Sequence, residues 1–199
     1  MVSSPYAPQF AIPDNCRHPL VETYISDLES GRVTFETIQC HESVHVDDRG
    51  VKTMDEGGNV VNWDCVHTSP VHYVWRMLAD FPIVIGITRG VKSDHEPHFH
   101  KEDECYFVID GCGVTLCNGA YTKLEKGHYF YIPGNTIHNT PILDQGLSVL
   151  FWFPNHAHFS RVRYYWKRDV AGNDEALERF ETVDRIRGEY LRELTHSLM

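Results

Sequence analysis

The chain has 199 residues and a formal net charge of −10, from 18 Lys and Arg against 28 Asp and Glu. This length is typical of one domain with short additions, and the acidic balance argues against nucleic acid or an anionic membrane as the main partner. No run of residues approaches the roughly 20 apolar positions that a membrane helix needs. We therefore expect one globular domain whose main partner is neither nucleic acid nor a membrane.

Two further features bear on the cellular location. Residues 1–15 lack the basic and then apolar segments of a secretory signal. The six cysteines are scattered without a C-x-x-C pair, which favours reduced thiols over a disulfide scaffold in a chain of this length. Both features predict a cytoplasmic protein.

The N-terminal part is predicted to be an arm followed by a short helix. Residues 1–18 contain several prolines and should be extended. Residues 19–30 predict a helix, because Pro19 suits a first turn, apolar residues recur on one face, and Gly31 suits the stop. Residues 47–59 are charged and contain glycine, so we expect a loop there.

From about residue 60 the pattern changes to short strands separated by Gly and Pro. These segments are rich in Val, Ile, Tyr, Phe and Trp, which favour strands. The predicted strands are 60–67, 71–78, 82–89, 104–110, 113–117, 128–132, 147–153 and 161–168. Many short strands at this spacing predict an all-β sandwich or barrel.

The C-terminal part returns to helix. Asn173 or Asp174 can cap it, and apolar residues then recur at three- and four-residue steps. They are Leu177, Phe180, Val183, Ile186, Tyr190 and Leu194. We expect this stripe to pack on the outside of the barrel, with a dimer contact as the alternative. The predicted division is an arm and helix over 1–59, a β-barrel over 60–168 and a C-terminal helix over 169–199.

The 13 histidines are the unusual feature of the composition, because His is the commonest metal ligand. On an extended strand, residues two apart point to the same face. His98 and His100 should therefore project together, with Phe99 pointing away, and Glu104 keeps the same parity. Two imidazoles and a carboxylate are then predicted to converge on one side of a sheet.

Two turns are predicted to complete this arrangement. Residues 111–113, Gly-Cys-Gly, suit a tight turn that starts the return strand. Pro133 and Gly134 suit the central positions of a type II turn, since Gly tolerates a positive φ. That turn leads to His138, which would supply a fourth ligand from another strand.

Three imidazoles and one carboxylate suit a borderline divalent metal, namely Fe(II), Mn(II), Ni(II), Co(II), Zn(II) or Cu(II). On an octahedral ion, four protein ligands leave two positions free for substrate, water or dioxygen. For zinc, the same four ligands can close a tetrahedral site and leave no room for chemistry. The identity of the metal therefore decides much of the function.

These residues resemble the two sequence motifs of the cupin superfamily. The first motif consists of a glycine, H-x-H, a glutamate and a second glycine, here Gly90, His98, His100, Glu104 and Gly111. The second motif matches at Gly127, Pro133 and His138, with Asn135 where the motif has glycine and Gly134 one place earlier. The resemblance implies a jelly-roll β-barrel with the metal inside and the helical ends packed outside.

The resemblance also implies a metal-dependent enzyme that acts on a small organic acid or related metabolite, although the cupin fold hosts unrelated chemistries. Fe(II)-dependent dioxygenation is the leading reaction. The alternative is a non-redox lyase, isomerase or decarboxylase, in which the metal acts as a Lewis acid. The family's dimethylsulfoniopropionate lyases are similar in combining these ligands with cavity tyrosines, here Tyr106 in Glu-x-Tyr. A small-molecule-binding cupin without catalysis is the further alternative.

Other residues are candidates for the substrate pocket. Tyr106 shares the parity of Glu104, so it either fills the barrel or acts as a general base or hydrogen-bond donor. Arg89 either holds a substrate carboxylate or forms a salt bridge at the rim, and we favour the salt bridge slightly. Aromatic residues should line the rest of the cavity, namely Tyr129 or Tyr131, Trp152 or Phe151 and Phe153, and Trp63 or Trp75.

Cupins commonly dimerise through exchanged edge strands, and an open sheet edge invites such pairing. The proline-containing arm is a candidate for that exchange. We therefore expect a homodimer.

Overall fold

A computed structural model describes residues 12–39, 42–46, 52–53, 72–91, 96–117, 119–140 and 142–197. The described helices are α1 (Pro19–Glu29) and α2 (Asp174–Ser197), with 3-10 turns η1 (Asp14–Cys16), η2 (Phe159–Arg161) and η3 (Lys167–Val170). The described strands are β1 (Glu42–Val46), β2 (Lys52–Thr53), β3 (His72–Asp80), β4 (Val84–Val91), β5 (His98–Phe99), β6 (Glu104–Cys117), β7 (Ala120–Glu125), β8 (Tyr129–Ile132), β9 (His138–Asn139), β10 (Ile142–Phe153) and β11 (Tyr165–Trp166). None of these helices is long and apolar enough to cross a membrane.

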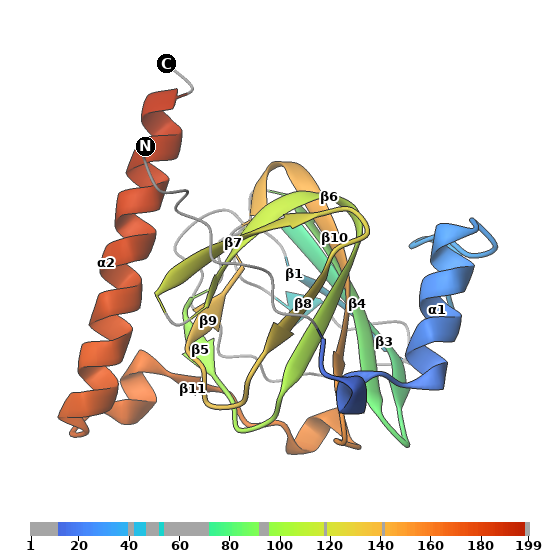
Figure 1. Ribbon diagram of the computed structural model, residues 1–199, viewed down its shortest axis with the longest axis horizontal. Coiled ribbons are helices and arrows are strands. Elements are labelled where there is room, and N and C mark those ends of the chain that lie inside the picture. The colour runs from blue at the N-terminus through green and yellow to red at the C-terminus, as the bar shows by residue number, and fades with distance from the viewer. Residues whose placement is uncertain are drawn as a thin grey trace.

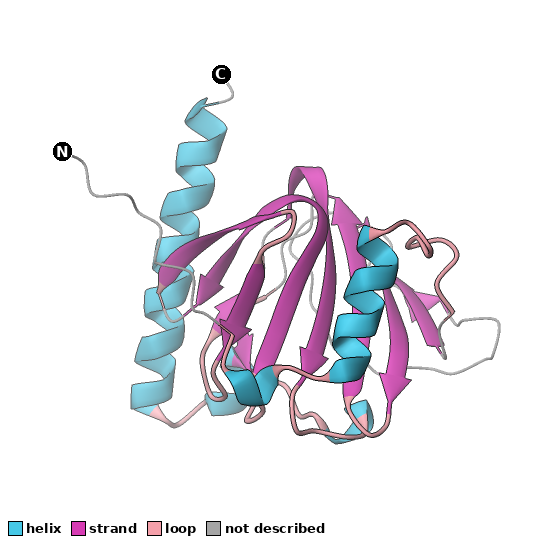
Figure 2. Ribbon diagram, turned by 45° about the vertical axis from the view of Figure 1, so that its right-hand side comes forward, coloured by secondary structure: helices cyan, strands magenta, loops and turns pink. Residues whose placement is uncertain are grey.

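The described strands form one curled antiparallel sheet that makes a half-barrel (Figure 1). Their order in space is β11-β5-β9-β6-β10-β4-β3-β1-β2, and β7 and β8 also pair with β6. α1 lies on one side of this sheet and α2 on the opposite side (Figures 1 and 2). The predicted all-β jelly-roll barrel with helices packed outside is therefore confirmed.

Strand β6 shows how the two faces of the sheet are used. Tyr106 and Val108 point to the inner face, where they pack with buried residues of β8 and β10. Cys105 and Phe107 point to the outer face beneath α1. This alternation follows from the two-residue repeat of a strand, and it separates the interior of the half-barrel from a second apolar layer.

The predicted N-terminal helix is confirmed as α1, which covers the outer face. Pro19 is its first residue, as expected, and Val21 and Ile25 are buried against the sheet. Trp152 of β10 donates a hydrogen bond from Nε1 to the backbone oxygen of Cys16 at 2.8 Å. The sheet therefore holds both α1 and the short turn that precedes it.

The predicted C-terminal helix is also confirmed, as α2. The side chain of Asn173 accepts a hydrogen bond from the backbone N–H of Ala176 at 3.1 Å, so Asn173 acts as the cap. Phe180 and Val183 are buried against Ile137. The apolar stripe therefore packs on the outside of the barrel through this part of the helix, while the side chains of residues 190–197 lie outside the described part of the chain.

The strands predicted over 104–110 and 113–117 are one continuous strand, β6, and the expected tight turn between them is wrong. Gly111 instead forms an irregularity, with φ at 81° and a shift in the register between β6 and β10. A Cβ at this position would lie 2.2 Å from the backbone oxygen of Gly146. Glycine therefore allows the strand to bend and continue.

Other parts of the sheet were not predicted. β1 lies between the predicted helix at 19–30 and the predicted loop at 47–59, β2 lies within that loop, and β7 follows β6. The predicted strand 161–168 contains only the two-residue β11, between η2 and η3. The predicted strand 60–67, including Trp63, lies outside the described residues, as does the side chain of Trp75.

Candidate metal centre

Three histidines converge on the inner side of the sheet. His98 in β5 lies opposite His138 in β9, and His100 follows β5. The ring centroid of His138 lies 4.5 Å from that of His98 and 5.0 Å from that of His100. One potential ligand atom from each lies within 4.8 Å of the others. Phe99 points away and packs against Tyr165 and Phe180, so the structure brings together the imidazoles that the sequence spacing grouped.

Each imidazole is oriented by a backbone carbonyl two residues away. Nδ1 of His98 lies 3.1 Å from the oxygen of Glu96, that of His100 2.8 Å from Glu102, and that of His138 2.8 Å from Thr136. A carbonyl oxygen only accepts, so each Nδ1 carries a proton, and in the neutral form of each ring Nε2 then keeps a lone pair. The hydrogen bond at Nδ1 fixes this tautomer, which is the one in which Nε2 binds metals.

Glu104, the first residue of β6, adds a carboxylate to the group. Its Oε2 lies 3.3 Å from Nε2 of both His100 and His138. Burial alone would raise the pKa of Glu104, but His100 and His138, when they carry a proton on Nε2, outweigh this effect and hold the pKa well below its usual range. The carboxylate is therefore ionised in the centre of the group.

The donor set fits a divalent transition metal. His138 Nε2 is fully buried and lacks a hydrogen-bond partner of acceptable geometry in the described chain, despite the nearby carboxylate. An unsatisfied buried nitrogen is costly, and a bound cation would satisfy it. Burial and the neighbouring imidazoles lower the pKa of His98, which favours its neutral, metal-binding form. Three nitrogens and one carboxylate suit the borderline metals.

The turn before His138 differs by one position from the prediction. Thr136 donates its N–H to the oxygen of Pro133 at 3.2 Å, so the central residues are Gly134 and Asn135. Asn135, not Gly134, has the positive φ of 62°, which asparagine tolerates better than most residues. Gly134 meets a different requirement, because a Cβ there would lie 2.2 Å from the backbone oxygen of Lys101.

Tyr106 lies beside the ligand group, as its parity with Glu104 predicts. Its hydroxyl donates a hydrogen bond to Glu104 Oε2 at 3.1 Å. Burial and the Glu104 carboxylate raise the pKa of Tyr106 well above its ordinary value. The phenol is therefore protonated and acts as a donor to the carboxylate in this structure.

Two aromatic residues near the histidines were missed by the sequence analysis. The ring of Tyr164 lies 5.0 Å from His98 and 5.4 Å from His100, and the ring of Trp166 lies 4.9 Å from His98. Pairing of β11 with β5 places Trp166 opposite His98. The available signal was the parity that Tyr164 and Trp166 share within the predicted strand 161–168, but the partner of that strand cannot be read from the sequence.

The predicted aromatic lining needs a correction. Trp152, Tyr129 and Tyr131 lie on the outer face, in the cluster beneath α1, and are not brought to the histidines. Phe153, the alternative to Trp152, has its ring 5.1 Å from that of His100. Neighbouring strand residues point to opposite faces, so the face that holds the ligands excludes the three outward residues.

Arg89 also faces outward, away from the histidines. Its guanidinium stacks on the ring of Phe35 at 4.2 Å, Nε donates to the hydroxyl of Ser148 at 2.9 Å, and Nη1 pairs with the Glu36 carboxylate. The salt bridge that we favoured is therefore present, and the structure does not bring Arg89 to the candidate metal centre.

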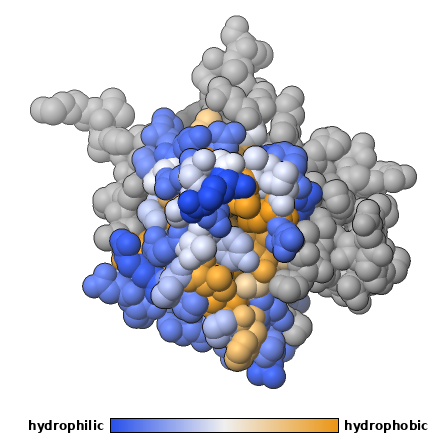
Figure 3. All heavy atoms as spheres, turned by 90° about the vertical axis from the view of Figure 1, so that its right-hand side faces the viewer, coloured by the Kyte–Doolittle hydropathy of each residue, from blue (hydrophilic) through white to orange (hydrophobic). Residues whose placement is uncertain are grey.

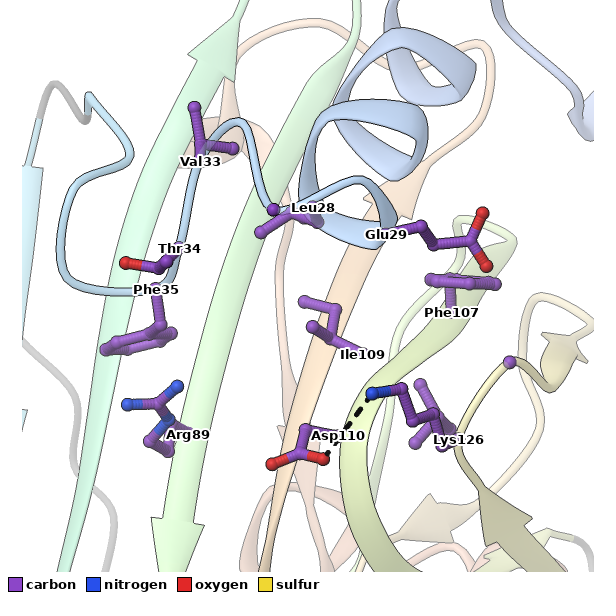
Figure 4. A pocket seen from close by; sticks show the side chains of 13 residues that line it. Leu28, Glu29, Val33, Thr34, Phe35, Arg89, Phe107, Ile109, Asp110 and Lys126 are labelled. Atoms are coloured by element: carbon purple, nitrogen blue, oxygen red, sulfur yellow. Dashed lines mark ion pairs between the residues drawn. The ribbon is translucent and has the colours of Figure 1, made fainter.

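A cavity of about 180 Å³ lies next to Arg89, between the end of α1 and strands β4 and β6 (Figure 4). Its walls are apolar at Leu28, Phe107 and Ile109. Lys126 and Asp110 also line it, with Nζ of Lys126 3.9 Å from Oδ1 of Asp110. On this side of the molecule hydrophobic residues lie among hydrophilic ones (Figure 3). The cavity is on the opposite face of the sheet from Tyr106 and is separate from the ligand group.

Known proteins match parts of the chain. A family model described as the cupin domain matches residues 89–153. A gentisate 1,2-dioxygenase of a Haloferax species is 26% identical over 85 residues, which cover 43% of this chain and 23% of that protein. The solved DMSP lyase of Ruegeria pomeroyi is 17% identical, with 42% of each chain covered and a TM-score of 0.38. A cupin-like protein of Thermotoga maritima is 18% identical, with 53% of this chain and 81% of that chain covered and a TM-score of 0.44.

The chain spans less than a quarter of the dioxygenase and less than half of the lyase. The cupin-domain match is more informative, because residues 89–153 contain both sequence motifs and all four ligand-type residues. The motifs, the half-barrel and this match together support the cupin superfamily for this chain.

Proposed function

We propose that this cupin is a metal-dependent enzyme that acts on a small organic acid or related metabolite, with Fe(II)-dependent dioxygenation as its reaction. The observation that carries the proposal is that His98, His100 and His138 each offer a ligand atom within 4.8 Å of the others, with the buried carboxylate of Glu104 3.3 Å from Nε2 of His100 and of His138. When bound, Fe(II) supplies the redox chemistry that reaction with dioxygen requires. The similarity to a gentisate dioxygenase supports an aromatic acid as the first substrate to test.

The residues of the chain have separate roles in this proposal. His98, His100 and His138 hold the metal through Nε2, and Glu104 holds it through its carboxylate. The hydroxyl of Tyr106 donates to that carboxylate and restricts its rotation. These contacts fix the ligands before the metal arrives.

Aromatic rings form the apolar side of the site. Tyr164 and Trp166 contact His98, and Phe153 contacts His100. Such rings exclude water and suit the planar, apolar part of a small acid. The substrate class of the proposal follows from this wall together with the metal, which can bind an acidic oxygen.

A second candidate function is a non-redox lyase, isomerase or decarboxylase. The observation that favours it is the Tyr106 hydroxyl 3.1 Å from Glu104, because a phenol at this place can exchange a proton with a bound substrate. In that case a bound metal would polarise a carboxylate or carbonyl of the substrate, and Tyr106 would have to be deprotonated to take the proton from the adjacent C–H.

Elemental analysis and oxygen uptake test the proposal. The protein is purified, its metal is measured, and the Fe(II)-loaded form is supplied with gentisate, other small aromatic acids and dimethylsulfoniopropionate in an oxygen electrode. We expect one metal per chain and oxygen consumption that depends on an aromatic acid. Product formation without oxygen would instead establish the lyase or isomerase reaction.

Two variants assign the residues. His100→Ala is expected to lose metal, and full metal occupancy in this variant would refute the ligand assignment. Tyr106→Phe is expected to keep the metal and to lower turnover. Unchanged turnover would reduce Tyr106 to a packing role.

A further inference from the structure

We propose that Asp103 is a positioning residue for the metal centre, because its carboxylate joins the two turns that carry His100 and His138. The inference rests on the proposed function, since it concerns the geometry of the same site. Asp103 is not counted among the ligands: it precedes Glu104, and its Oδ1 accepts a hydrogen bond from Gly134 in the second turn.

The first turn follows His100. It contains Lys101 and Glu102. The backbone oxygen of Glu102 accepts a hydrogen bond from Nδ1 of His100 at 2.8 Å. The position of this turn therefore sets the orientation of the His100 ring.

The second turn precedes His138. It runs from Pro133 to Thr136. The backbone oxygen of Thr136 accepts a hydrogen bond from Nδ1 of His138 at 2.8 Å. This turn orients the His138 ring in the same way.

Asp103 connects these two turns. Its Oδ1 accepts a hydrogen bond from the N–H of Gly134 at 2.7 Å. Beside it, the backbone N–H of Asn135 donates a hydrogen bond to the backbone oxygen of His100, also at 2.7 Å. The turns touch so closely that a Cβ on Gly134 would lie 2.2 Å from the oxygen of Lys101. A charged acceptor forms the stronger kind of hydrogen bond, so the carboxylate holds the two ring-orienting turns in contact.

The consequence for metal binding is geometric. The nitrogens of His100 and His138 must stay within a few tenths of an ångström of their binding positions, because metal sites depend on ligands that are held in place by surrounding hydrogen bonds. Without the Asp103 carboxylate, the two turns lose one of the two hydrogen bonds described above between them. We therefore expect weaker metal binding and a changed ligand field, with the four ligands still present.

Cobalt titration tests the inference. Metal-free wild type and Asp103→Ala are titrated with Co(II), whose visible absorption reports both affinity and ligand geometry. We expect Asp103→Ala to bind Co(II) at least about tenfold more weakly, within the range for groups that support ligands, and to show a shifted spectrum. Asp103→Asn keeps an acceptor oxygen for the N–H of Gly134. Its affinity for Co(II) is expected to stay within about twofold of that of the wild type.

Arg179→Ala is the matched control. The Arg179 guanidinium donates to the oxygen of Asn135 at 3.0 Å, so this variant also removes a hydrogen bond to the second turn, but one that does not reach the first turn. Its Co(II) affinity and spectrum should equal those of the wild type. If Arg179→Ala loses as much affinity as Asp103→Ala, the effect is general loosening and the inference is wrong.

Two further measurements cover the case in which Asp103→Ala does not fold. Asp103→Glu moves the carboxylate by one methylene and should give an intermediate loss of Co(II) affinity. Hydrogen exchange of the Gly134 amide in the metal-free wild type should be slow, and rapid exchange would overturn the inference. Equal Co(II) binding by wild type, Asp103→Ala and Asp103→Glu would also overturn it, whereas a wild type that binds no Co(II) would instead refute the proposed function.

Discussion

Single residues determine the chemistry of the candidate centre through the placement of protons. The three imidazoles donate hydrogen bonds from Nδ1 to backbone oxygens, and Nε2 of His100 and of His138 lies 3.3 Å from the Glu104 carboxylate. The hydroxyl of Tyr106 donates a hydrogen bond to the same carboxylate. The Glu104 carboxylate therefore has a hydrogen-bond donor in Tyr106 and, beside it, imidazole nitrogens that can hold a cation.

Substitution of Gly134 should disturb this arrangement through steric contact. A Cβ in Gly134→Ala would lie 2.2 Å from the Lys101 oxygen, so the two turns must separate. We expect a loss of about 1–3 kcal/mol in the free energy of unfolding, as for other overpacked sites, together with weaker metal binding. Chemical denaturation and a Co(II) titration measure the two effects.

Gly172→Ala provides the comparison for that experiment. Gly172 has φ at 91° but open space around it, so the substitution adds backbone strain without a steric clash. It should cost stability and leave Co(II) affinity unchanged. A loss of affinity in Gly172→Ala would argue against the steric explanation.

Tyr131 should titrate at unusually high pH. Burial and the nearby Asp103 carboxylate raise its pKa to about 12, because both disfavour the phenolate. In a spectrophotometric titration, the difference between wild type and Tyr131→Phe should show one phenolate that appears around pH 12. In an Asp103→Asn background the same difference should move to lower pH, and an ordinary midpoint near pH 10 in the wild type would contradict the prediction.

At the scale of elements, the faces of the strands divide the molecule into an inner layer with the ligands and an outer layer beneath α1. Strand alternation was readable from the sequence and predicted that His98 and His100 share a face. It did not reveal which face of β8 and β10 joins them, because both faces of these strands are aromatic or apolar. The register decides this point: Tyr106 lies opposite Phe151 and Phe130, which places Trp152 outward.

Contacts between distant segments were the other part that the sequence could not predict. His98, His100 and Glu104 are found because they lie two and four residues apart, and His138 is found through the second motif. Trp166 reaches His98 only through the pairing of β11 with β5, and a strand of two residues leaves almost no periodic pattern. Gly134 was expected to adopt the positive φ, but its contact with Lys101 depends on the meeting of two turns and was not visible either.

The docking of α1 can be tested by removing apolar volume. Ile25 is 4% exposed and packs in the outer cluster, so Ile25→Ala should reduce the free energy of unfolding by about 2–5 kcal/mol. Thr23→Ala on the exposed side of the same helix should change it by less than about 0.5 kcal/mol. Denaturant unfolding of both variants measures the difference, and similar small losses in both would mean that α1 contributes little to the fold.

At the scale of the whole molecule, the candidate centre lies where two very short strands meet a long one. β5 and β9 have two residues each, and the longer β6 supplies Glu104 beside them. A cation bound by residues of all three strands would cross-link this edge of the half-barrel. Metal binding and folding stability should therefore be coupled.

Addition of metal should raise the stability of the metal-free protein. At a free Zn(II) concentration of 100 times the Kd, binding to the folded state alone adds about 2.7 kcal/mol to the free energy of unfolding. His138→Ala should fold with much less response to Zn(II). Denaturation with and without Zn(II) measures the shift, and equal shifts in both proteins would place the bound metal elsewhere.

The backbone origin of the three ring-orienting oxygens has a consequence for variation among relatives. Peptide carbonyls are present whatever residue occupies a position, so replacement of the side chains at Glu96, Glu102 or Thr136 leaves all three orienting groups in the chain. The flanking sequence is therefore free to diverge while the imidazoles keep their tautomers. Insertions and deletions in the same turns have no such freedom, and distant relatives with this chemistry should conserve loop length here more strictly than loop composition.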